Sequence, residues 1–159
     1  MRNALLIGGL ALVLAVPNFA IVQKERLLAS GTPMLVELAP VDPRSLIQGD
    51  YMRLDYAIAR ALSMGAGSPR DGQLVVRLDD RGVAHFVRLH SAGTPLGPGE
   101  HLLLYRRRGS RTRIGTDAFF FQEGHANRYA GARYGELRVD GTGGSVLVGL
   151  RDSTQRPLR

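Results

Sequence analysis

The sequence predicts a mainly β protein, in which a single N-terminal transmembrane helix precedes one compact β-sheet or barrel-like domain with a short helix. Two observations support this prediction. The first 30 residues contain a long run without charge, which is typical of a membrane-embedded helix. The rest of the 159-residue chain alternates short apolar runs with turn residues, and it is long enough to bury a core.

The uncharged run covers residues 4–22 and reads ALLIGGLALVLAVPNFAIV. A helix of this length extends over about 28 Å, close to the roughly 30 Å hydrocarbon core of a bilayer. Its end contains Phe19 and Ile21 and lacks the small-residue cleavage site of a secretory signal peptide, so a retained anchor is favoured over a cleaved leader. We expect residues 1–30 to form a membrane anchor helix with its extension, in which residues 4–22 contact the lipid bilayer.

The residues ahead of this run set the expected location. Only a short, positively charged tail precedes it, and such a tail usually stays in the cytoplasm. The sequence therefore predicts a single-pass protein of the inner (cytoplasmic) membrane. Its C-terminal domain would then lie in the periplasm or another extracytoplasmic space.

After residue 30 the pattern is that of short strands bounded by turns. Strands are expected over residues 33–43, 51–58, 73–80, 83–90, 100–108 and 117–123, and over 134–152 as a hairpin with a glycine-rich turn. Residues 59–72 begin like a helical turn, and the spacing of Ala126, Tyr129 and Ala130 predicts a short helix within 123–135. We expect one β domain over 33–152 and a frayed tail over 153–159.

The composition excludes several kinds of chemistry. Without cysteine the chain has no disulfide, no thiolate nucleophile and no cysteine-bound metal. The net charge of +7 comes from 20 arginines and one lysine, which are mostly scattered among acidic residues. The exception is the cluster of Arg106, Arg107 and Arg108, followed by Arg111 and Arg113, which is either a contact for anionic groups or a solvated strand end. Nucleic-acid binding needs a basic face with interleaved aromatic residues, and the expected extracytoplasmic location argues against it, so no nucleic-acid partner is expected.

The sequence has no phosphate-binding loop, dinucleotide fingerprint or nucleophile elbow. Ser45 shortly precedes Gly49-Asp50, which resembles the arrangement of signal-peptidase-like Ser/Lys hydrolases. That pattern, however, places its serine at Val41, and the only lysine, Lys24, adjoins the expected membrane helix. We therefore expect no catalytic centre.

The histidines do not have the spacing of a metal site. His85 and His90 are five residues apart and would face opposite sides of a strand, while His101 begins another strand. Glu123 and His125 share a face but lack a third ligand. We expect neither a metal nor another cofactor.

Residues 46–56, LIQGDYMRLDY, contain the most distinctive local pattern. In a strand from Tyr51 onward, Met52, Leu54, Tyr56 and Ile58 fall on one face and form a credible core row. Gly49-Asp50-Tyr51, followed by Leu54 and Tyr56, resembles the signature for which the GDYXXLXY protein family is named, and similarity in the flanking segments extends over nearly the whole chain.

The resemblance implies a membrane-anchored bacterial protein with a polytopic membrane protein as its partner, and it implies no particular chemistry. We expect a non-catalytic extracytoplasmic β domain that docks on an integral membrane partner. The alternative is a ligand-binding or signal-peptidase-like hydrolytic domain that acts on envelope material, with a pocket lined by Tyr51, Tyr56 and Arg44.

Two candidate binding surfaces follow. The first lies around a proline-stiffened loop that presents arginine and tyrosine, the residue types common in interface hot spots. It comprises Asp42, Arg44, Gly49, Asp50, Tyr51, Leu54 and Tyr56. An ion pair of Arg44 with Asp42 or Asp50 that merely fixes the loop is the simpler alternative. The second surface comprises Glu123, Arg128, Tyr129, Arg133 and Tyr134, and a short helix that covers one end of the sheet explains it equally well.

Overall fold

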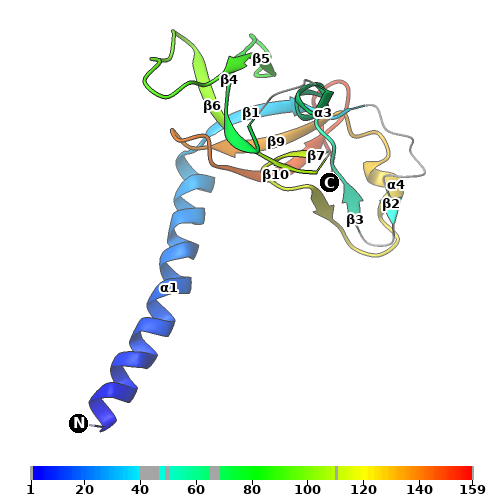
Figure 1. The fold of residues 1–159 in the computed structure, drawn as a ribbon. Coiled ribbons are helices and arrows are strands. Elements are labelled where there is room, and N and C mark those ends of the chain that lie inside the picture. Colours follow the sequence, from blue (N-terminus) through cyan, green and yellow to red (C-terminus); the bar gives the residue numbers. More distant parts are fainter. Residues whose placement is uncertain (1, 40–46, 49–50, 65–68, 110, 159) are drawn as a thin grey trace.

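The computed structural model describes residues 2–39, 47–48, 51–64, 69–109 and 111–158. Its first element is the long helix α1 (Arg2–Ser30), which projects from a body built mainly of strands (Figure 1). The helix ends where Gly31 donates its N–H to the carbonyl of Leu27 at 2.9 Å. Leu27 is buried, and Arg138 donates to the carbonyl of Gly31 at 3.2 Å, so the last turn of α1 is fixed to the body.

The first sheet is antiparallel and contains both the strand after α1 and the last strands of the chain. Its order is β1-β9-β10-β11, formed by β1 (Thr32–Glu37), β9 (Tyr134–Val139), β10 (Ser145–Arg151) and β11 (Pro157–Leu158). Alternate residues of β9, namely Gly135, Leu137 and Val139, are buried, as expected for a strand with one face on the core.

The second sheet has the order β5-β4-β6-β7. It is formed by β4 (Asp71–Leu78), β5 (Ala84–Leu89), β6 (Glu100–Arg108) and β7 (Arg111–Ile114). Three consecutive β4 residues, Leu74, Val75 and Val76, are fully buried. Because neighbouring side chains point to opposite faces, β4 is covered on both of its faces.

A small third sheet and two short helices complete the body. The sheet has the order β2-β3-β8 and is formed by β2 (Ile47–Gln48), β3 (Tyr51–Arg53) and β8 (Ala118–Phe120). Helix α3 (Ala57–Met64) contacts β7 and β1, and helix α4 (Ala126–Tyr129) lies between β8 and β9 in the chain. One core joins all three sheets through Met34, Leu137, Leu74, Leu103, Ile114 and Met52.

Three turns are built alike on an aspartate. One carboxylate oxygen of Asp79, Asp140 or Asp152 accepts the backbone N–H groups two and four residues further on, at 2.8 to 2.9 Å. A short acidic side chain can satisfy turn amides in this way, which is why aspartate is common in turns. These three turns connect β4 to β5, β9 to β10, and β10 to β11.

The expected transmembrane helix is not found. Among the described residues, no helix is long and apolar enough to cross a membrane. The prediction of a membrane-spanning helix over 4–22 is therefore wrong.

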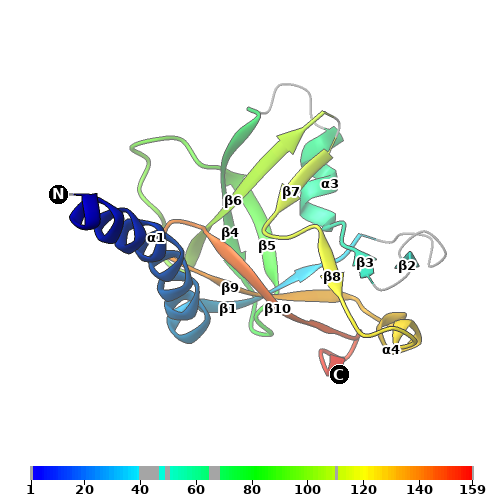
Figure 2. The ribbon, with the colours of Figure 1, turned by 90° about the horizontal axis from the view of Figure 1, so that it is seen from below.

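The mainly β class is confirmed, but the expectation of a single sheet or barrel is wrong. The described strands form three separate sheets (Figure 2). β8 and β10 belong to different sheets and do not pair with each other. The chain leaves β7 at Gly115, whose φ of 59° turns it away from the second sheet and toward β8.

Two local expectations also need correction. The strand expected over 51–58 ends at Arg53, and helix α3 begins at Ala57. The tail expected to fray is ordered instead, because the Asp152 turn folds it back and Leu158 pairs with Leu150.

Candidate functional site

The described part of the signature stretch faces the core. Met52, Leu54 and Tyr56 are 2, 3 and 2% exposed, so the predicted core row is confirmed for these three residues. Its fourth member, Ile58, lies in helix α3 and is partly buried. Of the first candidate surface, Asp42, Arg44, Gly49 and Asp50 lie outside the described residues. Leu54 and Tyr56 are covered by the domain itself, which leaves Tyr51 as the described member of that surface with a partly exposed side chain.

Tyr56 occupies an unusual environment. Its hydroxyl is buried without a hydrogen-bond partner among the described residues, and burial raises the pKa of the phenol well above its ordinary value. A hollow of about 40 Å³ borders it, room for a few water molecules at most. This geometry suits packing and does not provide a substrate pocket.

Tyr51 belongs to an exposed aromatic pair. It is opposite Phe120 in the β3–β8 ladder, and the two ring centroids are 5.8 Å apart in a tilted arrangement. Phe120 is 74% exposed, the highest exposure of any described large apolar side chain in the domain. Exposed aromatic side chains are common anchors of protein interfaces.

The second candidate surface is divided by the fold. Tyr129 of α4 packs between Phe119 and Phe121, with ring centroids 5.0 and 5.2 Å away, so it fixes the helix over the end of β8. Glu123 and Arg128 are exposed near this helix. The backbone of Arg133, in contrast, forms hydrogen bonds with Leu38 and Arg151. Tyr134 belongs to β9 and is paired with a residue of β1. The arrangement is that of a short helix covering one end of the sheet.

A groove that sequence reasoning missed lies beside these aromatic residues. It has a volume of about 440 Å³, within the range of roughly 300–1,000 Å³ typical of ligand sites. The groove, named here the β8–β10 groove, is lined by Lys24, Gly115, Thr116, Ala118, Phe119, Phe120, Ser145, Val146 and Leu147. These residues come from three distant segments, so no local motif could have indicated the groove.

Arginines line a second hollow, of about 510 Å³, at the turn between β6 and β7. Its lining residues are Arg70, Arg107, Arg108 and Gly109. Arg106 and Arg108 are exposed and Arg107 is partly buried, as the alternation of a strand requires. This hollow contains two of the three arginines of the predicted cluster.

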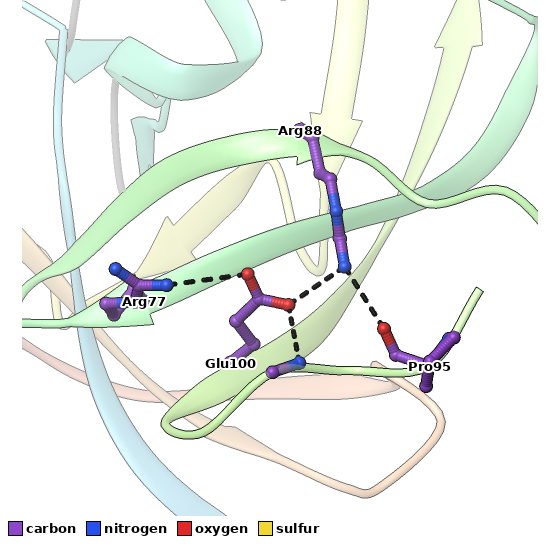
Figure 3. Close-up of polar contacts among 5 residues, drawn as sticks. Arg77, Arg88, Pro95 and Glu100 are labelled. Atoms are coloured by element: carbon purple, nitrogen blue, oxygen red, sulfur yellow. Dashed lines mark hydrogen bonds and ion pairs between the residues drawn. The ribbon is translucent and has the colours of Figure 1, made fainter.

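An ion network around a buried carboxylate stabilises the loop before β6. Glu100, whose side chain is 7% exposed, contacts Arg88 at 2.9 Å and Arg77 at 3.6 Å and accepts the backbone N–H of Gly97 at 2.9 Å (Figure 3). Arg88 also donates to the carbonyl of Pro95 at 3.3 Å. The network fixes residues 95–100 against β4 and β5.

The titratable groups do not form a reactive constellation in the described part of the chain. His85 bonds to the turn residue Asp79 at 3.0 Å. No three His, Asp or Glu side chains of the described residues are placed to hold a metal ion. Lys24 lines the groove, whereas Ser45 lies outside the described residues.

The fold and the groove define a mainly β domain with a projecting N-terminal helix. The model of the family described as GDYXXLXY protein matches residues 13–150, and the chain belongs to this family. No curated protein and no solved structure matches the chain.

Proposed function

We propose that the chain is a non-catalytic β domain that docks on a polytopic membrane protein through helix α1. The single observation that carries this proposal is the exposure of apolar side chains along α1. Val13, Leu14, Val16 and Phe19 are 68, 53, 65 and 67% exposed. Large exposed apolar surfaces mark sites of interaction with proteins or membranes.

The distribution of these side chains specifies the kind of partner. At 100° per residue, Val13, Leu14, Val16 and Phe19 point in different directions around the helix axis. A helix that is apolar on all sides requires apolar surroundings on all sides. The apolar helices of an integral membrane protein offer such surroundings, and the family resemblance supports the same class of partner. On this proposal the β domain lies on the extracytoplasmic side of the inner membrane.

The alternative, a ligand-binding or hydrolytic domain with its pocket at the signature residues, gains no support from the surroundings of Tyr56. It requires Tyr51, Tyr56 and Arg44 to line one pocket, but Tyr56 is buried against the core and Arg44 lies outside the described residues. The 40 Å³ hollow beside Tyr56 is too small for a substrate.

Affinity purification of the full-length chain from cross-linked membranes in mild detergent tests the proposal. We expect a polytopic membrane protein to co-purify with the wild type and to be lost from Phe19→Arg. Phe86→Arg is the matched control, because Phe86 is also an exposed phenylalanine, 46% exposed, but lies on β5 away from α1. Recovery of the chain alone, or equal recovery of the partner with both variants, would contradict the proposal. A C-terminal reporter fusion checks the extracytoplasmic location separately.

A further inference from the structure

Strands β8 and β10 each have backbone on one edge that pairs with no other strand among the described residues. β8 pairs on one side with β3, and its other edge is open. β10 pairs with β9 along its length, but β11 covers its second edge only at Leu150 and Arg151. Residues Val146 to Val148 of β10 therefore have no partner strand on that side, whereas Ser145 lies against Gly115. Open edges expose backbone N–H and C=O groups that can pair with another strand.

The lining of the β8–β10 groove includes residues of both strands. The groove is lined by three consecutive residues from each strand, namely residues 118–120 of β8 and residues 145–147 of β10. Side chains of consecutive strand residues alternate between the two faces of a sheet. Consecutive residues share one groove only when the groove follows the edge of the strand, where the backbone is accessible.

We propose that the β8–β10 groove binds an extended segment of the docking partner, which adds a strand between β8 and β10. This inference rests on the proposed docking function and names the chemistry of the partner. The added strand would join the first and third sheets into one sheet, in the order β2-β3-β8-segment-β10-β9-β1. Strand addition of this kind supplies affinity through main-chain hydrogen bonds and specificity through alternate side chains.

The groove also restricts the sequence of the segment. Ala118, Phe119, Val146 and Leu147 line its walls, so apolar side chains at alternate positions of the segment fit them. Among the described lining residues, Lys24 is the charged one, and it lies on α1. A carboxylate on the segment complements it, since opposite charges across an interface fix register and partner choice. The proposed occupant is therefore an apolar, extended segment with an acidic residue at one end.

The first experiment is a charge exchange with two fluorescent peptides. Both are six residues long and alternate valine with threonine, and one ends in glutamate whereas the other ends in lysine. The full-length wild type should bind the acidic peptide about fivefold or more tightly than the basic one. Lys24→Glu should reverse the order. Arg26→Glu, an exposed residue of the same helix that does not line the groove, should behave like the wild type.

Hydrogen exchange locates the bound peptide. With the acidic peptide present, we expect slower exchange in residues 118–120 and 145–148, and unchanged exchange in β4. Three results would overturn the inference. The first is binding without this protection, and the second is equal binding of both peptides by the wild type. The third is no saturation up to about 1 mM peptide, which corresponds to a binding free energy weaker than roughly −4 kcal/mol.

The experiments can refute each of the two proposals independently of the other. If Lys24→Glu retains the co-purifying membrane protein and neither peptide binds, the groove proposal fails while docking through α1 stands. If the acidic peptide binds with the expected protection but no polytopic protein co-purifies, the groove proposal stands and the proposed partner is wrong.

Discussion

Tyr56 packs directly against Gly135. A Cβ atom added at Gly135 would lie 2.9 Å from Cε1 and 3.1 Å from the hydroxyl oxygen of Tyr56. The last residue of the family signature and a glycine of β9 thus meet in the core, although they are far apart in the chain. The contact explains why a side chain larger than that of glycine would collide with Tyr56 at position 135. It also shows that the second signature tyrosine has a structural role.

Gly135→Ala should destabilise the domain. The new methyl group would overlap the Tyr56 ring, and Leu147 is also close at 3.3 Å, so we expect the free energy of unfolding to fall by about 1–3 kcal/mol. Gly149→Ala is the matched control in the same sheet, because nothing lies within 4 Å of its added Cβ. Urea denaturation of both variants measures the difference, and equal midpoints would show that the ring moves aside without cost.

Tyr56→Phe should retain or increase stability. The hydroxyl is buried without a partner among the described residues, so its removal should raise the free energy of unfolding by up to about 1 kcal/mol. Tyr105→Phe is the control, because the Tyr105 hydroxyl donates to the carbonyl of Pro69 at 3.4 Å and its loss should be neutral or destabilising. A clear destabilisation by Tyr56→Phe would reveal a partner for this hydroxyl.

The same substitution should change the response to alkaline pH. Burial raises the pKa of Tyr56 above its ordinary value of 10.0, so the folded state favours the neutral phenol. That contribution is complete below pH 10 and is lost as the pH rises further, because the unfolded chain then releases a proton that the folded chain retains. Between pH 9 and pH 11, the unfolding free energy of the wild type should fall more steeply than that of Tyr56→Phe. Parallel curves in thermal denaturation would contradict this expectation.

Glu100→Gln should weaken the network around the loop before β6. The amide cannot neutralise Arg88, whose side chain is 35% exposed, so we expect a loss of about 1–3 kcal/mol. Arg77, at 59% exposure, should contribute little to this loss. Glu37→Gln, at an exposed position of β1, is the control and should change stability by less than about 0.5 kcal/mol. Chemical denaturation distinguishes the two variants, and equal stabilities would show that the network is not stabilising.

Acid should destabilise the fold partly through its aspartate turns. For Asp140, burial favours the neutral acid, but the combined hydrogen bonds from Thr142, Gly144 and Gly143 outweigh it and hold the pKa below its ordinary value. Hydrogen bonds from His85 and Val83 to Asp79, and from Thr154 and Arg156 to Asp152, lower the pKa of those carboxyl groups too. A lowered pKa gives stability that is complete above the ordinary value of 3.8 and is lost as the pH falls below it.

The variant Asp140→Asn tests this relationship. It keeps a side-chain oxygen acceptor but removes the charge, so its loss of stability between pH 6 and pH 3 should be smaller than that of the wild type. The exposed Asp80, which belongs to the first of the three aspartate turns, provides the control variant Asp80→Asn. An identical acid response of wild type and Asp140→Asn in thermal melts would show that the other carboxyl groups dominate.

The sequence predicted much of the local structure. The β4–β5 hairpin, the β9–β10 hairpin, the strand at 100–108 and the short helix within 123–135 all follow from alternation, turn residues and helical spacing. Such features depend on neighbouring residues, so they can be deduced from a short window. The inward orientation of Met52, Leu54 and Tyr56 was predicted in the same way.

The errors arose where distant segments decide the outcome. The extended pattern of residues 51–58 did not reveal that α3 begins at Ala57, where its apolar face packs against β7 and β1. The C-terminal tail looked weak by itself, but β10 offered an edge for Leu158. The apolar run in α1 indicated a membrane span, whereas the described helix does not meet the length and apolarity required.

The sequence by itself determined the mainly β class, the positions of most strands and the family, because periodicity and a specific signature are local properties. The tertiary structure alone decided that Tyr56 contacts Gly135, that the strands form separate sheets, and that Lys24, β8 and β10 enclose one groove. These relationships depend on which strand edges pair and which remain open, and strand pairing joins residues whose distance along the chain carries no information about their distance in space.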